Sequence, residues 1–537
     1  MKKYLIRFAA VHCGLSMCFA KRCVFTGFLV FGFLSNSWAA NWYVSKSGNN
    51  AGDGKTWSTA WNDFAKINWT LIKPGDVIYL DGGTNGMLYG PLNTGADGSG
   101  PDGRIFLKRS IETGHSGIVT TGRIKINNKY ITLDGVERDK IIVAPHGGYN
   151  VDVYGDYFEL KNTYVKGDFA AVSAGVFIWG TSMYARAPNI RLYRTTFNES
   201  NGEDMIKYVG GGTLTIEESL FMNNVGPADG QHRDVLQIDG GNNFSLNISR
   251  NIFWNTADVF MLQCGNKPIK NINAAYNVFA KTGDALKIGL YSSIGTVTVY
   301  NNIFYHNRDL IGVLGKFRNN IFVGPSHFRG PVHTGGNDIK YNIWTAGTEH
   351  FVSGEGNIVK DPIFADVTNA LGPDGIPFTN DDGFRLDSES PGIDAGEDVG
   401  YSIDISGNVI NGIPDIGAYE YCAGNCITIP DGTPGDDPPN LEPASDPKFG
   451  LFKNIFNPTK EQLTITYTAA GDSITLVVYD RVGNEIKTLE RGTPTAEGYQ
   501  TTWDGRNNPG SIVASGVYMV VIKQGSKVIK TKVVVVK

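Results

Sequence analysis

Asp234-Val-Leu-Gln-Ile238 is one of five short segments that repeat one pattern, an Asp followed by four mostly apolar residues. The other segments start at Asp204, Asp258, Asp284 and Asp309, so the pattern returns after 30, 24, 26 and 25 residues. A period in this range is typical of a solenoid in which each repeat forms one coil. Stacked coils would align the five carboxylates along one edge of a long parallel sheet. We expect the functional site at this edge.

A second ladder runs through the same part of the chain and supports the period. Thr195 and Ser219 open its first two segments, and an Asn opens each later one. Asn tolerates left-handed backbone and bonds its own main chain, so it suits a bend between strands. Stacked side-chain amides can also bond along the column. We interpret the ladder as structural, with the aromatic residues stacked in the interior. The Asn segments are Asn251-Ile-Phe253, Asn277-Val-Phe279, Asn302-Ile-Phe304, Asn320-Ile-Phe322 and Asn342-Ile-Trp344.

The composition fits an all-β protein with short strands and many turns. Gly accounts for 67 of the 537 residues, well above the usual share of about 7%. Segments such as Ile105-Phe-Leu107 and Ile190-Arg-Leu192 alternate like three-residue strands. The net charge of −5 gives no indication of nucleic acid binding. We therefore predict an all-β fold that begins with a solenoid built on a long parallel sheet.

The two ends of the solenoid carry family patterns. Trp42-Tyr-Val-Ser-Lys-Ser-Gly48 and Ile72-Lys-Pro-Gly-Asp-Val-Ile-Tyr-Leu80 resemble the N-terminal coil of bacterial proteins of the pectate-lyase-like superfamily. Asp361-Pro-Ile-Phe364 and Pro414-Asp-Ile-Gly-Ala-Tyr-Glu-Tyr421 resemble the C-terminal cap of secreted bacterial β-helix proteins. The resemblance implies a right-handed parallel β-helix, which we place at residues 41–428.

A second domain follows a linker. Residues 429–448 contain six prolines among Asp and Gly, so we expect an extended, semi-rigid linker. Phe456-Asn-Pro458, Trp503-Asp-Gly-Arg-Asn507 and Ala514-Ser-Gly-Val-Tyr518 resemble the flagellar-hook-cap-type (FlgD-like) immunoglobulin-like domain. The resemblance implies a small antiparallel β-sandwich at residues 449–537. It also implies a role in sorting or surface attachment, through secretion or anchoring machinery.

Residues 1–40 have the pattern of a secretory signal peptide. An apolar run from Cys23 to Leu34 follows two basic residues, and Ser37-Trp-Ala39 offers small residues for cleavage, with Met17 as an alternative start. The run is too short for a good membrane span. We expect a secreted or cell-surface monomer that does not span the membrane. After cleavage Cys264, Cys422 and Cys426 remain, and the last two could form a disulfide in an oxidising compartment.

Reactive side chains concentrate on two consecutive repeats. An elongated groove of acids, bases and amides suits an acidic polysaccharide, and clustered Asp residues supply the oxygen ligands that Ca²⁺ requires. We assign Glu203 and Gln237 to substrate binding and Asp204, Asp234 and Asp258 to the metal. The candidate catalytic residues are Lys207, His232, Arg233 and Lys287.

These residue types fit lytic β-elimination at a uronate. The proton at C5 is weakly acidic, and calcium bridging the uronate carboxylate would stabilise the charge that develops. A Lys or Arg whose pKa is depressed by neighbouring cations could then take the proton. Some pectate lyases on this fold resemble this plan, with an Asp–calcium cluster and a Lys base. The sequence therefore favours a calcium-assisted polysaccharide lyase.

Three alternatives stay open. Asp204 and Asp234 could act as the paired carboxylates of a glycoside hydrolase, although the polygalacturonase pattern is absent. Epimerisation at C5 also begins with proton removal. In the third alternative, the protein binds glycans at the cell surface without cleaving them. In that case the Asp residues simply cap backbone N–H groups at a recurrent bend.

Overall fold

A computed structural model describes most of the two predicted domains. The predicted signal peptide, up to residue 38, and the whole predicted linker lie outside the described residues. In the part of the chain that is described, no helix is long and apolar enough to cross a lipid bilayer. The described ranges are 39–49, 51–144, 149–167, 182–199, 204–224, 234–239, 244–262, 269–283, 285–288, 294–307, 309–311, 315–324, 327–329, 338–345, 354–410, 412–423, 449–451, 455–460, 462–467, 474–480, 484–492, 499–524 and 527–537.

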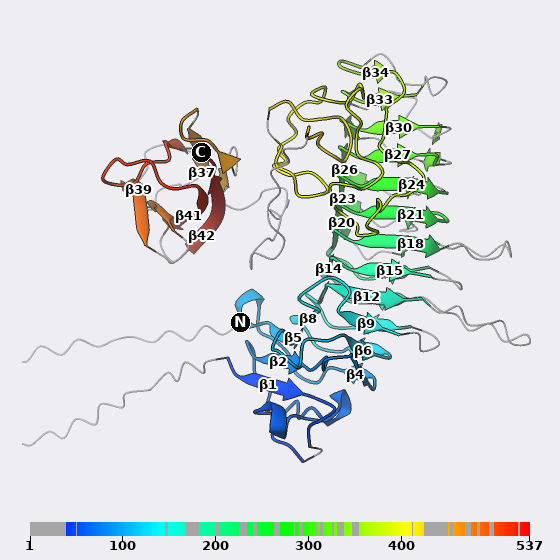
Figure 1. The fold of residues 1–537 in the computed structure, drawn as a ribbon, viewed down its shortest axis with the longest axis vertical. Coiled ribbons are helices and arrows are strands. Elements are labelled where there is room, and N and C mark those ends of the chain that lie inside the picture. The colour runs from blue at the N-terminus through cyan, green and yellow to red at the C-terminus, as the bar shows by residue number, and fades with distance from the viewer. Residues whose placement is uncertain are drawn as a thin grey trace, which may run out of the picture. The chain divides into compact units, whose positions relative to one another are not determined.

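Three parallel sheets form the N-terminal domain, and the chain visits them in a fixed order (Figure 1). Each coil contributes one strand to each sheet, and the coils wind in the right-handed sense usual for parallel connections. This is the predicted right-handed parallel β-helix. The first sheet contains, in spatial order, β1 (Asn41–Val44), β2 (Val77–Leu80), β5 (Ile105–Arg109), β8 (Ile131–Asp134), β11 (Glu159–Lys161), β14 (Ile190–Tyr193), β17 (Thr213–Glu217), β20 (Phe244–Ser249), β23 (Ile269–Ala275), β26 (Ile294–Tyr300), β29 (Lys316–Arg318) and β32 (Asp338–Lys340).

The second sheet follows the first after a short bend in most coils. It contains β3 (Met87–Tyr89), β6 (Val119–Thr121), β9 (Ile141–Val143), β12 (Thr163–Lys166), β15 (Thr196–Asn198), β18 (Leu220–Asn224), β21 (Ile252–Thr256), β24 (Val278–Thr282), β27 (Ile303–Tyr305), β30 (Ile321–Val323), β33 (Ile343–Trp344) and β34 (Ile358–Val359).

The third sheet completes each coil. It contains β4 (Leu92–Asn93), β7 (Ile124–Ile126), β10 (Val151–Val153), β13 (Met183–Ala185), β16 (Ile206–Tyr208), β19 (Leu236–Ile238), β22 (Phe260–Leu262), β25 (Leu286–Ile288), β28 (Asp309–Ile311) and β31 (His327–Arg329).

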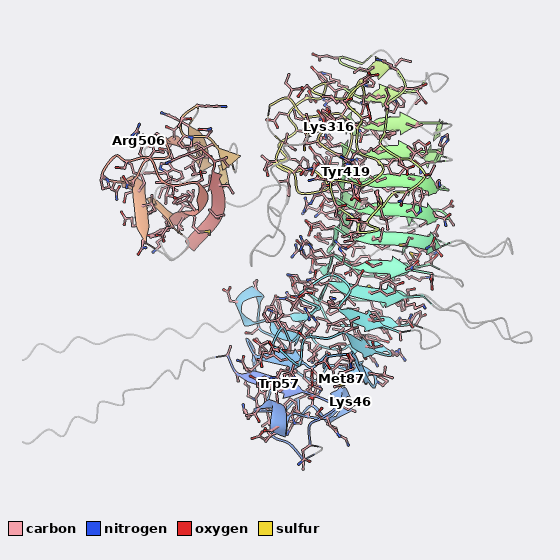
Figure 2. The ribbon with its side chains drawn as sticks, in the orientation of Figure 1. Lys46, Trp57, Met87, Lys316, Tyr419 and Arg506 are labelled. Atoms are coloured by element: carbon pink, nitrogen blue, oxygen red, sulfur yellow. The ribbon has the colours of Figure 1, made fainter. Side chains whose placement is uncertain are left out.

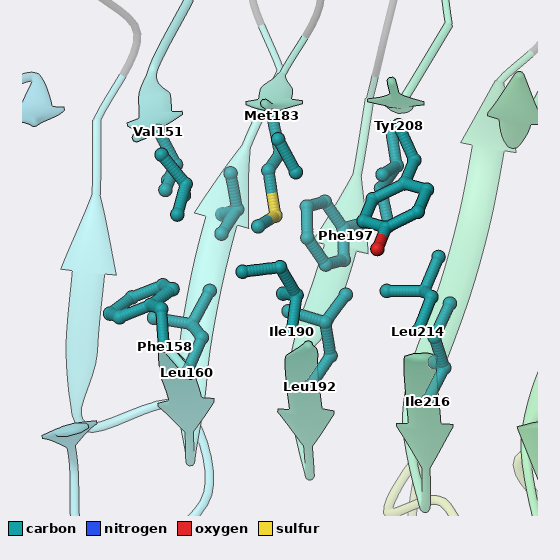
Figure 3. Close-up of a cluster of buried hydrophobic side chains, with 14 of the residues drawn as sticks. Val151, Phe158, Leu160, Met183, Ile190, Leu192, Phe197, Tyr208, Leu214 and Ile216 are labelled. Atoms are coloured by element: carbon teal, nitrogen blue, oxygen red, sulfur yellow. The ribbon is translucent and has the colours of Figure 1, made fainter. Parts of the chain in front are cut away.

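Alternating side chains fill the interior of the solenoid. Leu160, Leu192 and Ile216 occupy the same register position on three consecutive strands of the first sheet, and all three are buried (Figure 3). Burying one such side chain contributes roughly 1.5–3 kcal/mol. The core therefore grows coil by coil, and every coil depends on its neighbours for coverage.

The bend between the first and second sheets explains the Asn ladder. Arg250 and Tyr276, with φ of 53° and 55°, adopt the left-handed conformation just before Asn251 and Asn277. Asn251 Nδ2 donates to Asn277 Oδ1 at 2.9 Å, and Asn277 Nδ2 donates to Asn302 Oδ1 at 2.9 Å. The predicted structural role of this ladder is confirmed.

The aromatic residues that follow the ladder stack as predicted. The rings of Phe253 and Phe279 are 4.9 Å apart and nearly parallel, and Phe279 and Phe304 repeat this geometry. The ring spacing matches the spacing of neighbouring strands, about 4.8 Å. The stack therefore follows directly from the register of the second sheet.

The first coil is closed by an N-terminal cap that includes the short 3₁₀ helices η1 (Trp57–Thr59) and η2 (Phe64–Lys66), and a third, η3 (Pro101–Gly103), precedes β5. Asp76, from the Pro-Gly-Asp motif, accepts hydrogen bonds from Trp42 Nε1 and from the backbone N–H of Ala40, each at 2.8 Å. Trp57, labelled in Figure 2, stacks on His115 with ring centroids 4.1 Å apart. The motif therefore joins the first two strands of the first sheet.

The segment that follows β34, residues 360–410 and 412–423, packs along the outer face of the second sheet and so does more than close the end of the solenoid as the resemblance implies. In Figure 1 this segment, in yellow, lies beside β24, β27 and β30. Its Phe384 and Tyr419 share an apolar cluster with Ile303 and Ile321 of that sheet. Asn301 Nδ2 also donates to the backbone oxygen of Asp415 at 3.0 Å. The segment therefore covers a face that a polymer would otherwise reach.

Two sheets form the C-terminal domain. Their core contains Val478, Trp503 and Val520, all fully buried. Pairing is antiparallel except between β36 and β42, so the predicted small β-sandwich is confirmed. One sheet contains β35 (Phe449–Leu451), β37 (Leu463–Tyr467) and β40 (Tyr499–Trp503), and the other contains β36 (Ile455–Phe456), β42 (Lys527–Val535), β41 (Gly516–Gln524), β38 (Ile474–Tyr479) and β39 (Glu485–Gly492).

Cys422 is disulfide-bonded, and its partner lies outside the described residues. The predicted pair Cys422–Cys426 and the predicted burial of Cys264 therefore stay predictions.

Candidate functional site on the third sheet

In the third sheet, the central residue of β7, β13, β16 and β19 is half-buried between two buried neighbours. In β16, Ile206 and Tyr208 are buried, whereas Lys207 between them is half-buried. The strands of this sheet pair in parallel and in register, so their central residues form one column along the solenoid. In chain order the column contains Lys125, Asp152, Tyr184, Lys207, Gln237, Met261 and Lys287.

A buried carboxylate organises the early part of this column. Asp152 lies on β10, and its side chain is 2% exposed. Arg123 Nη2 is 2.9 Å from Asp152 Oδ2, and Arg186 Nε is 3.2 Å from Asp152 Oδ1. Two guanidinium groups held by one carboxylate leave a net positive charge at the surface.

Three tyrosines surround Arg186. Its guanidinium carbon lies 3.7 Å from the ring centroid of Tyr184 and 4.9 Å from that of Tyr154. Tyr149 stacks on Tyr184 with ring centroids 4.8 Å apart. Burial alone would lower the pKa of Arg186, but Asp152 and the neighbouring tyrosines raise it. We call Tyr149, Tyr154, Tyr184 and Arg186 the tyrosine–arginine cluster.

Lys207 forms an ion pair across two coils. Its Nζ atom is 3.3 Å from Oδ2 of Asp239, the residue that follows β19. Partial burial would lower the pKa of Lys207, but the charge and hydrogen bond of Asp239 and the charge of Asp204 raise it. The expectation of a depressed pKa at this lysine is therefore wrong, because carboxylates surround it where cations were expected.

The Asp residues lie at the bend that leads into the third sheet. Asp204 is 4% exposed, and its Oδ1 accepts the backbone N–H of Asp234 at 3.1 Å. Asp234 is fully buried, and its backbone oxygen accepts hydrogen bonds from the backbone N–H of Met205 and from Asn224 Nδ2. Asp204 thus caps the main chain of the next coil, whereas Asn251 at the other bend accepts the backbone N–H of Ser219 in the preceding coil.

The fit of these carboxylates to calcium is poor in the described residues. Their oxygens are the donor type that calcium prefers, but a site needs six to eight ligands. Asp204 and Asp234 are buried, and no group of three or more carboxylate, imidazole or thiolate side chains arranged to hold a metal ion occurs among the residues that the structure describes. Asp204, Asp234 and Asp258 would therefore need further ligands.

The remaining predicted site residues are only partly placed. Glu203, His232 and Arg233 lie outside the described residues. Gln237 pairs with Lys207 on the neighbouring strand. The backbone of Lys287 lies three strands beyond Lys207 in the same column, a separation of about 14 Å. The backbones of the two lysines therefore lie on well-separated coils.

A second concentration of charge lies at the bend between the first and second sheets, and it is structural. Glu218 Oε2 accepts from Arg194 Nε at 2.7 Å, and its Oε1 accepts from Arg250 Nη2 at 3.1 Å. Burial would raise the pKa of Glu218, but Arg250 and Arg194 lower it to about 2. These groups neutralise one another below the surface, so we do not assign them to ligand binding.

The sequence prediction missed Arg123, Asp152 and the tyrosine–arginine cluster. Their coils lack the leading Asp that identified the later repeats, so the pattern did not extend to them. The signal was the same three-residue alternation, in Val151-Asp-Val153 and Met183-Tyr-Ala185. The register between neighbouring coils brings these residues together. Because the repeats differ in length, this register is hard to predict from the sequence.

Comparison with known proteins gives one family match. The model of the FlgD Ig-like domain matches residues 454–527. No curated protein matches the chain. Among solved structures, a mannuronic acid specific polysaccharide family 6 lyase from human gut microbiota is similar, with 13% identity and a TM-score of 0.32 over 51% of this chain and 70% of that chain. A family PL6 polysaccharide lyase from Pseudopedobacter saltans has 15% identity and a TM-score of 0.38 over 61% of this chain and 96% of that chain.

Proposed function

We propose that the β-helix domain is a secreted polysaccharide lyase that binds an acidic polysaccharide along the outer face of the third sheet. The observation that carries this proposal is the column of cations on that face. Arg123, Lys125, Arg186 and Lys207 lie there, and the carboxylates that form ion pairs with them in the described part of the chain are those of Asp152 and Asp239. Such a face attracts a polyanion, and its linear arrangement suits a polymer.

Lys207 is the residue we assign as the base. In its neutral form, Nζ would take the C5 proton of a uronate, the bond between C4 and the glycosidic oxygen would break, and a C4–C5 double bond would form. The departing oxygen would take a proton from water or a nearby acid. Because Asp239 favours the charged amine, only a small fraction of Lys207 is neutral at pH 7. The reaction should therefore be faster in alkaline solution.

Calcium stays part of the proposal as a separate prediction. Bound at the uronate carboxylate, the ion would stabilise the negative charge that develops on proton removal. Asp204, Asp234 and Asp258 are the candidate ligands. The described carboxylates do not complete a site, so no step of the mechanism above depends on the metal.

The C-terminal domain is proposed to sort or attach the secreted protein. Its match to the FlgD Ig-like domain over residues 454–527 supports a separate module next to the lyase domain. Expression of the chain with and without residues 449–537 in a secreting bacterial host tests this role. We expect the shortened protein in the medium and the full protein at the cell surface.

The assay of the lyase activity uses residues 41–537 and a panel of pectate, alginate, and sulfated or glucuronate-rich glycans, with calcium and with chelator. New unsaturated uronate ends absorb ultraviolet light, and a reducing-end assay runs beside this measurement. Absorbance that grows with time supports the lyase. Reducing ends without absorbance indicate hydrolysis.

Glycan binding without cleavage is the second candidate function. The capping role of Asp204 favours it, because this carboxylate has a structural task that needs no substrate. Binding to an acidic glycan with neither absorbance nor reducing ends would support it. A hydrolase with Asp204 and Asp234 has less support, because both carboxylates are buried.

A further inference from the structure

We propose that the tyrosine–arginine cluster is a separate subsite that holds a carboxylated sugar unit of the polymer away from the bond that is cleaved. The inference rests on the proposed function, because the polymer bound there is the substrate assigned to Lys207. It goes further in naming the residues that hold the polymer. It also sets a minimum length for an efficient substrate.

The rings of the cluster are held in place. Tyr154 follows β10 and is 46% exposed, while Tyr149 and Tyr184 stack on each other at 4.8 Å. Rigid aromatic rings present an apolar face at low cost in conformational entropy, with a hydroxyl for hydrogen bonding. The apolar face of a sugar ring can pack on such a surface, so the cluster is suited to a sugar.

The charge of the cluster selects an acidic sugar. Asp152 fixes Arg186 through Nε, and the guanidinium has further N–H donors directed by its planar geometry. Arg123 and Lys125 lie on the same side, and the Lys125 amine is 5.1 Å from the Tyr154 ring centroid. Three cations against one carboxylate leave an excess of positive charge. A sugar carboxylate would pair with it through charge-assisted hydrogen bonds.

The register sets the distance from the proposed base. Tyr184 lies one strand from Lys207 and Asp152 lies two strands from it, so the cluster begins about 5–10 Å from the base. A polymer that runs along the column places the sugar units next to the cleaved one against the cluster. A single sugar unit bound at Lys207 does not reach it.

Tyr154→Ala is the variant that tests the subsite, because this ring is the most exposed in the cluster and its loss leaves the Asp152 ion pairs in place. Tyr157→Ala is the matched control. Tyr157 is 40% exposed and stacks on Tyr130 at 4.5 Å, outside the third sheet. A third variant, Arg186→Lys, keeps the positive charge but loses the planar guanidinium group and its paired N–H donors. Equal melting temperatures would show that the variants fold.

The experiment measures the dissociation constants of galacturonate and mannuronate as single units and as hexasaccharides, with the neutral cello-oligosaccharides as a comparison, on a Lys207→Ala background. For an acidic hexasaccharide we expect Tyr154→Ala and Arg186→Lys each to weaken binding about tenfold, as for the loss of one ordinary contact. The Tyr157→Ala control should bind the hexasaccharide as tightly as the background protein, and the single units should bind much more weakly than the hexasaccharides. Sulfated neutral oligosaccharides would show whether sulfate replaces the carboxylate.

Two results would overturn the subsite. One is acidic hexasaccharide binding that Tyr154→Ala and Arg186→Lys leave unchanged, and the other is the absence of binding by every acidic probe. The proposed lyase can fail independently, since a protein without turnover can still bind the hexasaccharide through the cluster. Conversely, normal turnover of long polymers by Tyr154→Ala would retain the lyase and reject the subsite.

Discussion

At the residue scale, the role of each buried carboxylate depends on the group that it holds. Asp204 caps the next coil and Asp152 holds two arginines, although both are aspartates beside the same sheet. The sequence correctly placed Lys207 and Gln237 at the same register position, with Asp204 and Asp234 at the bend before them. Asp309 is displaced by one residue from the predicted column, because Leu286 pairs with Leu310. The sequence could not reveal the ion pair between Asp239 and Lys207, because these residues lie on neighbouring coils. The loop that connects the coils has a length that the sequence pattern does not predict.

The ion pair of Lys207 gives a prediction about pH. The base must be neutral, and Asp239 holds its pKa above the ordinary value, so kcat/KM should increase as pH rises. Asp239→Asn removes the charge that favours the protonated amine, which lowers the pKa of Lys207 and moves the rising limb to lower pH. Measuring kcat/KM against pH for the wild type and for Asp239→Asn checks this prediction. A rise in kcat/KM over the same pH range in both proteins would contradict it. Lys207→Ala should abolish the activity at every pH.

The Asn ladder gives a prediction about stability. Asn277→Ala removes a buried amide that donates to Asn302 Oδ1 and to the backbone oxygen of Ile248 and that accepts the N–H of Asn251. We expect a loss of about 2–5 kcal/mol in the free energy of unfolding, because buried partners are left without hydrogen bonds. Urea denaturation measures it. Asn273→Ala, whose half-buried amide bonds to Asn247 on the outer face, should lose much less.

At the element scale, we place the site on the third sheet because a later segment packs on the second sheet. The three-residue strands, their period and the two bends could be predicted from local patterns. The position of the segment that follows β34 could not, because contacts such as Asn301 with Asp415 join residues 114 apart in sequence. The family resemblance identified this segment correctly as the exit from the solenoid, but gave no indication of the face that it covers.

Buried carboxyls in this segment predict its dependence on pH. Burial raises the pKa of Asp382 to about 7 and that of Asp404 to about 6, above the ordinary value near 4. Folding therefore favours the protonated forms of these two carboxyl groups. This stabilisation is complete when the pH is below their ordinary pKa near 4, and it is lost as the pH rises to about 7. The β-helix should melt at a higher temperature at pH 5 than at pH 8.

Asp382→Asn separates this effect from other titrations. The amide oxygen can still accept from the Tyr419 hydroxyl and from the Phe378 backbone N–H, which bond to Asp382 at 2.9 Å each. Because the amide does not titrate, the difference in melting temperature between pH 5 and pH 8 should shrink. A wild-type protein that is more stable at pH 8 would refute the explanation.

At the scale of the whole molecule, a rigid solenoid presents a column of cations and tyrosines, and a separate β-sandwich follows it. The sequence predicted both folds, since each has local patterns that repeat along the chain. It predicted the site less well, because the tyrosine–arginine cluster is assembled by register between coils. Fold by itself does not assign chemistry on such a scaffold.

Calcium dependence is tested on the complete protein. If Asp204, Asp234 and Asp258 hold the ion, a chelator should abolish turnover, added calcium should restore it, and Asp258→Asn should require more calcium. Asp258 is chosen because it is half-buried, whereas Asp234 is fully buried and its loss would also disturb the fold. Full turnover in the presence of chelator would remove calcium from the mechanism.

The most direct measurement of the central claim is the rate at which ultraviolet absorbance from unsaturated uronate ends appears when wild-type protein and Lys207→Ala are mixed with the same acidic polysaccharide. The account predicts steady growth of absorbance with the wild type and a loss of at least about a thousandfold with Lys207→Ala. Both proteins should melt at the same temperature, since the Lys207 side chain is outside the core. Equal rates for the two proteins, or no absorbance with any acidic polysaccharide, would contradict it.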